Sequence, residues 1–423
     1  MKKILIALLL CHGFAAAADP LGPVPEAVMA QLTLADAEQL WEHRNLETQL
    51  ARDQVAAAAA DKLGAAQYPV PQLSMNTSAL NVGRSAPPLG SQTAAEADVV
   101  LRLDQTIERG GKRDLRMRSA DLRFDASRHS LADMHRQGRI ALHRAYYDLL
   151  LAQEKLTIAQ SSAELFEQTV SAARLRVNTG DIAPAELSRI RVDALRAAND
   201  VRQAQNDMQQ AQSALAYLLG AASGATALHA AGPWPDIQPP GDSPIRIEQR
   251  PDVLAATDQF HAVEAARQLA MSMTTRDVTV GLQVERNGGN APMHSVGFGV
   301  SIPLLTGYRY RGDIARAEAD LQVARDTLEE IRAQAITEVS KSRSDLIAAQ
   351  ERIARFDEDL LPEATHVLNS AEFAYRQGAH SVMDLLDARR TYKAVQMDAA
   401  TAHADYAKAL AAWRNDIGEQ DRP

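Results

Sequence analysis

The chain has 423 residues, with 45 basic and 54 acidic side chains and a net charge of −9 at pH 7. This acidic balance argues against nucleic acid and anionic lipid as partners, because both carry negative charge themselves. No stretch after the N-terminal segment approaches 18 consecutive apolar residues, so a transmembrane helix is not expected.

Residues 1–18 have the pattern of an export signal peptide. Lys2 and Lys3 precede a short apolar run, and alanines at 16–18 suit a signal peptidase that cleaves before Asp19. Leucines precede Cys11 where a lipoprotein signal needs small residues, so lipidation is not expected. A mature chain then has a net charge of −11 and no cysteine, which excludes disulfides, thiolate nucleophiles and Cys-based metal sites.

An internal repeat with a spacing of 198 residues organises the rest of the chain. Gly180 in VNTGDIAPAEL corresponds to Gly378 in YRQGAHSVMDL, and QTIER at 105–109 corresponds to PLLTG at 303–307. Two landmarks in one register predict two copies of one structural unit. We assign the first copy to residues 32–220, a linker rich in Gly, Pro and Ala to 221–246, and the second copy to 247–418.

Each copy is predicted to begin with a helix, at 34–64 and 247–272, followed by two strands. Thr33 with Asp36 is the N-terminal signal of the first helix. The strands are expected at 72–81 and 97–107 in copy one, and at 277–285 and 295–305 in copy two. Apolar residues alternate there with polar or very small ones, as in the run from Val278 to Glu285.

A very long helix follows in each copy, at 112–178 and 310–376. About 66 residues make a rod on the order of 100 Å. Heptad ladders run from Leu142 to Val177 and from Val339 through Leu360 and Val367 to Ala374, which predicts a coiled coil. Pro362 is expected to bend the second rod. The glycine landmarks fit the left-handed position that ends a helix, so returning helices are expected at 183–219 and 381–413.

The strands indicate the class of protein. Their two faces match the lipid-out, lumen-in alternation of outer-membrane barrels. Four strands cannot close a barrel, and lipid does not tolerate an open sheet edge, so the chain must borrow strands from copies of itself. The expected fold is an internally duplicated α+β membrane protein, whose homotrimer forms a 12-stranded β-barrel and a periplasmic α-barrel of coiled-coil hairpins.

With this duplication, element order and pair of tip motifs, the chain resembles the TolC-like outer-membrane efflux channels from about residue 32 to 418. The segment QTIERGGKR at 105–113 is similar to the strand-to-helix junction of the cobalt–zinc–cadmium (CzcC-type) branch. The resemblance implies a homotrimer in outer-membrane lipid of a Gram-negative cell, extending into the periplasm. It also implies a passive conduit that is not an enzyme, has no cofactor or resident metal, and works with a periplasmic membrane-fusion adaptor and an inner-membrane RND-type pump.

The resemblance also assigns roles to residues near the glycine landmarks. The positions expected to dock the adaptor are Gly180, Ala183, Gly378 and Ser381; a role of the glycines as helix caps alone is the alternative. Asp384 and Asp387 match the family's constriction carboxylates and share one helix face. Copy one has Glu186 and Arg189 at the equivalent positions. A solvated acidic helix turn is the alternative to this periplasmic gate.

The sequence leaves alternatives for the cargo, for the protein class and for two histidines. The cargo is expected to be heavy-metal cations such as cobalt, zinc or cadmium, with organic solutes as the alternative. A periplasmic coiled-coil adaptor or scaffold is the less favoured protein class, since adaptors carry one hairpin beside compact β-domains. His135 and His143 are eight residues apart, but without acidic residues in ligand spacing we expect a surface or seam role for them.

Overall fold

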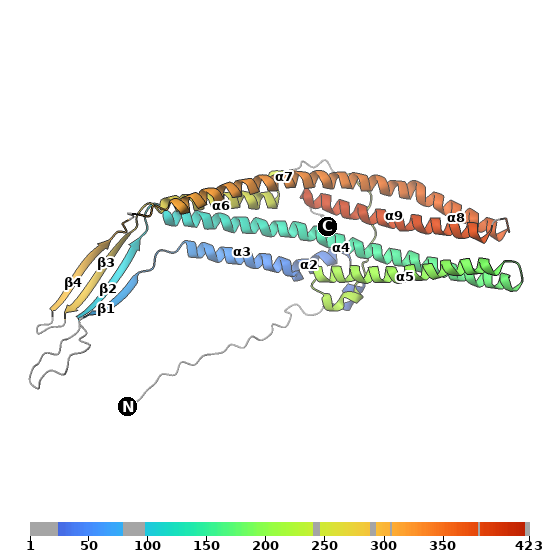
Figure 1. Ribbon diagram of the computed structural model, residues 1–423, viewed down its shortest axis with the longest axis horizontal. Coiled ribbons are helices and arrows are strands. Elements are labelled where there is room, and N and C mark those ends of the chain that lie inside the picture. The colour runs from blue at the N-terminus through green and yellow to red at the C-terminus, as the bar shows by residue number, and fades with distance from the viewer. Residues whose placement is uncertain are drawn as a thin grey trace, which may run out of the picture.

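The computed structural model describes residues 24–78, 98–239, 246–287, 293–304, 307–379 and 381–418. The expected signal peptide, residues 1–18, lies outside this part of the chain. The molecule is elongated, with its strands at one end and the turns of two helical hairpins at the other (Figure 1). The elements of the first copy are α1 (Glu26–Ala30), α2 (Leu34–Arg44), α3 (Leu46–Ala65), β1 (Gln72–Ser78), β2 (Asp98–Ile107), α4 (Lys112–Asn178) and α5 (Pro184–Leu218). After a 3₁₀ turn (Ala222–Ala227), the second copy contains a 3₁₀ turn (Ile247–Gln249), α6 (Pro251–Ser272), β3 (Val278–Asn287), β4 (Met293–Ser301), α7 (Arg311–Arg355), a π-helical turn (Phe356–Leu360), α8 (Leu361–Arg376) and α9 (Val382–Asp416).

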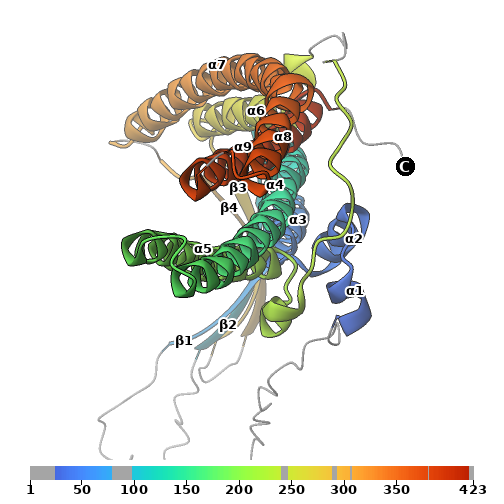
Figure 2. The ribbon, with the colours of Figure 1, turned by 90° about the vertical axis from the view of Figure 1, so that its right-hand side faces the viewer.

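The helices form a curved wall, and α1 and α2 lie on one side of it (Figure 2). Helix α4 has 67 residues and runs the length of the wall, where it contacts α3 and α6 toward the sheet and α5 and α9 toward the tips. Trp41, Leu142 and Tyr146 belong to the buried cluster that joins α2, α4, the end of α5 and the linker. In the described chain, no helix is long and apolar enough to cross a membrane.

The second long rod is interrupted, as Pro362 led us to expect, but the break begins before the proline. A π-helical turn covers Phe356–Leu360. Proline has no N–H and its ring crowds the carbonyl of the residue four positions earlier, and the wider π turn relieves that conflict. One extra residue in the turn rotates the following helix by roughly 100°. The predicted heptad ladder is therefore right from Val339 to Ile353 and wrong beyond it, where Leu360 and Val367 are exposed.

The first predicted helix, residues 34–64, is in fact two helices that meet at Asn45. Thr33 and Asp36, the predicted N-terminal signal, form a capping box at the start of α2. Asn45 has extended backbone, and its side chain accepts a hydrogen bond from Thr48 N–H at 2.9 Å, which starts α3. The Asn45 amide also donates to the carbonyl of Leu218, the last residue of α5, at 3.1 Å. One neutral side chain thus joins the end of α5 to the start of α3.

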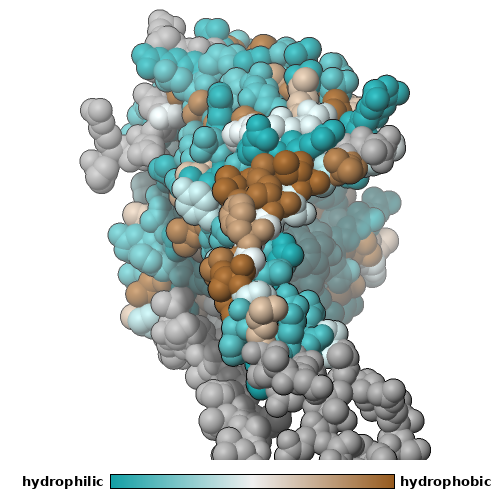
Figure 3. All heavy atoms as spheres, turned by 90° about the vertical axis from the view of Figure 1, so that its left-hand side faces the viewer, coloured by the Kyte–Doolittle hydropathy of each residue, from teal (hydrophilic) through white to brown (hydrophobic). Residues whose placement is uncertain are grey.

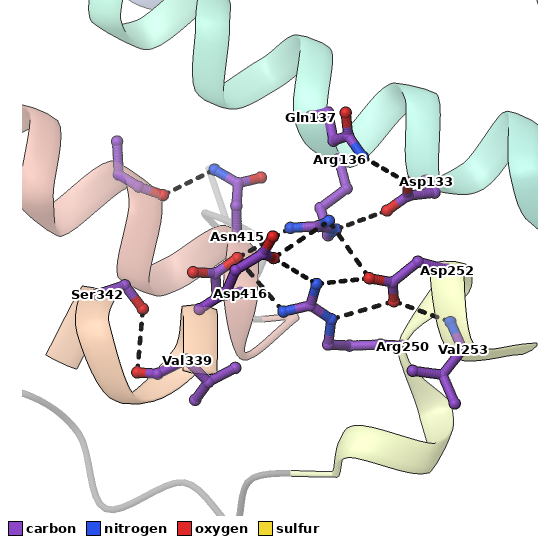
Figure 4. A network of polar contacts seen from close by, with 12 residues as sticks. Asp133, Arg136, Gln137, Arg250, Asp252, Val253, Val339, Ser342, Asn415 and Asp416 are labelled. Atoms are coloured by element: carbon purple, nitrogen blue, oxygen red, sulfur yellow. Dashed lines mark hydrogen bonds and ion pairs between the residues drawn. The ribbon is translucent and has the colours of Figure 1, made fainter. Parts of the chain in front are cut away.

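The corresponding junction of copy two is ionic (Figure 4). Asp416, the last residue of α9, accepts a hydrogen bond from Arg136 Nη1 of α4 at 2.9 Å, and Arg250 Nη1 lies 3.8 Å from the same carboxylate oxygen. Arg250, just before α6, donates to Asp252 at 2.6 Å and to Glu338 of α7 at 2.7 Å. Burial raises the pKa of Asp416, and nearby Ser342, Arg136 and Arg250 offset this only in part. The end of α9 is therefore tied to α4, α6 and α7 through charges.

All four predicted strands are present and form one antiparallel sheet in the order β1-β2-β3-β4. The β2–β3 pair joins the two copies; within it Leu101 lies opposite Val284, and Arg102 opposite Gln283. Residues 79–81 and 97, at the predicted ends of the first two strands, lie outside the described residues. β4 ends at Ser301, earlier than predicted, because Pro303 has no N–H to donate to a ladder; residue 305, the predicted end, lies outside the described residues.

Candidate functional site

The turn of the first hairpin, between α4 and α5, is closed by Gly180. Its φ of +82° is in the left-handed region that glycine adopts without strain. The Gly180 N–H donates to the Val177 carbonyl at 3.1 Å, and the Asp181 N–H donates to the Arg176 carbonyl at 2.8 Å. These two bonds are the Schellman arrangement, which satisfies the last carbonyls of α4.

The second hairpin ends in the same way at Gly378, whose φ is +73°. Gly378 N–H donates to the Tyr375 carbonyl at 3.0 Å, and Ala379 N–H donates to the Ala374 carbonyl at 2.9 Å. A Cβ added at Gly180 or at Gly378 would meet no atom of the described residues within 4 Å. Both glycines are therefore required by backbone conformation and not by crowding, and the space beside both turns is open.

The returning helices begin differently in the two copies. Ser381 forms a capping box with Asp384: Ser381 Oγ and N–H donate to the carboxylate at 2.8 and 3.0 Å, and Asp384 N–H donates to Ser381 Oγ at 3.3 Å. Ala183, the equivalent residue before α5, has no side chain that can accept, and Pro184 opens that helix. Of the two helix starts that the structure describes here, that of α9 is held by a side-chain cap and that of α5 is not.

Asp384 and Asp387 lie in the first two turns of α9, and both are exposed. The structure gives Asp384 a local role that sequence reasoning missed, since its carboxylate caps the helix. The spacing of Ser381 and Asp384 is the signal that reveals it. The gate role of the two carboxylates and the docking role of the tips remain predictions.

Near the tips, the two hairpins are tied together by polar contacts. Arg390 of α9 forms an ion pair with Asp193 of α5, which is only 6% exposed. Lys393 lies 2.5 Å from Asp200, and Arg176 donates to the Tyr375 hydroxyl at 3.2 Å. These partners are 193 to 199 residues apart, so no local pattern predicts them.

An apolar cluster lies beneath these polar links. Phe166 and Val170 of α4 and Ile190 of α5 pack with Val382 and Leu386 from the start of α9. The helix that carries Asp384 and Asp387 is therefore seated on the first hairpin by burial as well as by charge.

The sheet has one apolar and one polar face. The cross-strand register places on the apolar face the exposed side chains of Leu73, Met75, Leu101, Leu103, Leu282, Val284, Val296, Phe298 and Val300. Seen from the sheet end, hydrophobic side chains form a continuous run (Figure 3). Such a surface is larger than isolated exposed apolar residues produce and marks a contact with lipid or protein.

His135 and His143 face α2 and do not pair with each other. His143 Nε2 lies 2.5 Å from Glu38 Oε1, and this hydrogen bond lowers the pKa of Glu38. Burial lowers the pKa of His135, whose ring packs edge-on against Trp41. Over the residues that the structure describes, no group of three His, Cys, Asp or Glu side chains is placed to hold a metal ion.

The sequence profile of the family described as "Outer membrane efflux protein" matches residues 36–221 and 246–419, which is most of the chain. The chain belongs to this family. As an outer membrane efflux protein it is a channel and not an enzyme, and it belongs in the outer membrane with its helical part in the periplasm, as predicted.

Known relatives and solved structures agree with this assignment. The efflux protein is 26% identical to the cobalt-zinc-cadmium resistance protein CzcC of Cupriavidus metallidurans over 287 residues, 67% of this chain and 68% of that protein. It is 24% identical to the outer membrane efflux protein BepC of Brucella suis over 349 residues, 81% and 76% of the two chains. The fold is similar to that of the outer-membrane channel OprN, with a TM-score of 0.78, 21% identity and coverage of 92% of this chain and 90% of that chain. For CusC the TM-score is 0.72 and the identity 18%, with 92% of each chain covered. The predicted TolC-like resemblance is thereby confirmed.

Proposed function

We propose that three copies of this efflux protein close into one channel, with a 12-stranded barrel in the outer membrane and a tube of helical hairpins in the periplasm. The observation that supports this most directly is the two-faced sheet. Its apolar face carries Leu101, Leu282 and Phe298 at 44%, 53% and 74% exposure, and within the described ranges its edge strands β1 and β4 pair with no strand on their outer sides. Lipid can cover such a face, but lipid does not tolerate an open edge, so further copies must supply strands.

In this assembly the channel is the outer component of a tripartite efflux system. The open turns at Gly180 and Gly378, with Ala183 and Ser381 at the helix starts, would contact a periplasmic adaptor bound to an inner-membrane RND-type pump. The pump supplies the energy and selects the cargo, and the channel is a passive conduit.

Asp384 and Asp387 would place six carboxylates around the periplasmic mouth of the trimer. Crowded like charges attract cations and resist passage of anions. The ties between hairpins, such as Arg390 with Asp193, would hold the start of α9 in place while the mouth is closed.

We propose heavy-metal cations as the cargo, which the 26% identity to the cobalt-zinc-cadmium resistance protein CzcC supports. Organic solutes are the second candidate, since the channels of this family that resemble the chain also include BepC, whose name specifies no metal.

The test of the channel combines assembly with conductance. Purified protein should run as a trimer by native mass spectrometry and should open discrete conductances in planar lipid bilayers. A monomer that stays in solution without detergent would refute the proposal.

The cargo is tested by comparing a deletion strain with its parent on cobalt, zinc and cadmium salts and on a panel of dyes. Sensitivity to dyes alone would replace the metal assignment with the organic one.

A further inference from the structure

A charge pair lies flat on the polar face of the sheet. The register places on this face Asp98, Arg102 and Asp104 of β2 and Glu285 of β3. Among the residues of the four described strands, Arg102 is the one basic side chain on this face. Arg102 Nε donates to Asp104 Oδ1 at 2.9 Å, and the two side chains are 35% and 23% exposed.

The pair lies over Gly281, in space that is free because this residue has no side chain. A Cβ at Gly281 would lie 2.2 Å from Asp104 Oδ1, 3.0 Å from Arg102 Nη2 and 3.1 Å from Arg102 Nε. Gly299, the cross-strand partner of Gly281, leaves 3.6 Å between an added Cβ and Arg102 Nη2. The guanidinium therefore extends from β2 across Gly281 toward β4, close to the backbone.

We propose that Arg102 and Asp104, held against the sheet by Gly281, determine the ion selectivity and the bore of the barrel section of the channel. This inference rests on the proposed trimer, in which the polar face lines the lumen and brings three such pairs to one level. Within the described strands, the four charged residues of the face sum to a net charge of −2 in each protomer, and Arg102 is the residue that reduces the acidic charge. Charged side chains in a narrow pore select ions by sign.

The two members of the pair have opposite effects on selectivity. Arg102→Gln leaves Asp104 without its partner and makes the lumen more acidic, so cations are favoured. Asp104→Asn leaves Arg102 without its partner and makes the lumen less acidic, so the preference for cations falls. One charge at about 8 Å from a passing ion in water changes the local concentration of that ion by about two-fold, and it acts oppositely on cations and anions.

The glycines provide a test of geometry at constant charge. In Gly281→Ala, the new methyl group takes the space of the Asp104 and Arg102 side chains, which must move away from the sheet into the lumen. Gly299→Ala adds the same methyl group on the same face at the same level, but its contact with Arg102 is of ordinary van der Waals length. The single-channel conductance should therefore fall in Gly281→Ala and stay at the wild-type value in Gly299→Ala.

The experiment uses the full-length protein in planar bilayers under a KCl gradient, with reversal potential and single-channel conductance as readouts. We expect Arg102→Gln and Asp104→Asn to shift the reversal potential in opposite directions. As a second route to the same charge, Arg102→Cys is treated with a cationic and with an anionic methanethiosulfonate. The cationic reagent should restore the wild-type potential, and the anionic one should move it further away; wild-type channels given both reagents are the control.

Two failures can be told apart. If wild-type protein opens no conductance, the proposed channel is refuted and this inference with it. If wild-type channels open but the two charge variants shift the potential in the same direction or not at all, only the role of Arg102 and Asp104 is refuted. Equal conductance in Gly281→Ala and Gly299→Ala overturns the role of Gly281.

Discussion

Arg250→Met is expected to loosen the junction at which α9 meets α6. The Arg250 side chain is 5% exposed and donates hydrogen bonds to Asp252 at 3.1 and 2.6 Å and to Glu338 at 2.7 Å. Methionine fills most of the volume but leaves the acidic side chains around Arg136 with one arginine in place of two. Breaking a buried ion pair from one side costs about 3–5 kcal/mol. Glu338 is 53% exposed and screened by water, so we expect the lower end, about 3 kcal/mol.

The assay is the unfolding rate in guanidinium chloride, because membrane assemblies seldom unfold reversibly. Trp413 of α9 is 2% exposed and reports on the junction by its fluorescence. A loss of about 3 kcal/mol accelerates unfolding by up to about 100-fold when the contacts are absent from the transition state. Arg246→Met is the matched control, since the Arg246 side chain is exposed and donates to the Gln249 side chain at 3.3 Å.

Asp416→Asn completes the test through a double-mutant cycle. Because the pKa of Asp416 is raised, its contribution to stability is fully present below the ordinary value of 3.8 and is lost as pH rises through the raised pKa. At pH 7 the buried, ionised Asp416 carboxylate therefore lowers the stability of the fold, and it lowers it further when Arg250 is removed. Asp416→Asn should therefore recover part of the loss in Arg250→Met. Equal unfolding rates for Arg250→Met and Arg246→Met, or no recovery by Asp416→Asn, would refute the reasoning.

Three further predictions concern the tip, the mouth and the helix α2. Gly180→Ala should destabilise the first hairpin by about 1–2 kcal/mol, because alanine is strained at positive φ. Gly64→Ala, in open space within α3, should instead stabilise the protein by about 0.5–1 kcal/mol. Hydrogen exchange shows whether each substitution lowers or raises the local stability. Asp387→Asn, which leaves the helix cap intact, should raise single-channel conductance and weaken block by lanthanum(III); unchanged block would argue against the gate. Glu38→Gln should make the loss of stability at acid pH smaller. The pKa of Glu38 is lowered, first by its hydrogen bond with His143, so this carboxylate stabilises the fold above pH 4.5, and that stabilisation disappears as the pH falls through the lowered pKa. Unfolding rates measured between pH 7 and pH 3 test this.

Much of the fold could be predicted because strand and helix have different periods. Alternation with period two placed Leu101 and Arg102 on opposite faces of β2, and the pairings with Val284 and Gln283 agree with it. The glycine landmarks at 180 and 378 predicted both hairpin turns, because only glycine adopts positive φ without strain. The charge asymmetry between the copies at the tips was also visible, but the capping role of Asp384 was missed.

The sequence by itself determined the duplication, the two faces of the sheet, the hairpins and their turns, since each depends on residues close together in the chain. Tertiary structure alone decided which distant side chains meet. Arg390 pairs with Asp193 across 197 residues, and Arg250 and Asp416 meet where α9 ends and α6 begins. It also decided where a periodic pattern stops, because the π turn before Pro362 rotates the heptad ladder away from its partner. A local pattern states which face of an element is apolar, whereas the partner of a charge depends on how elements are brought together in space.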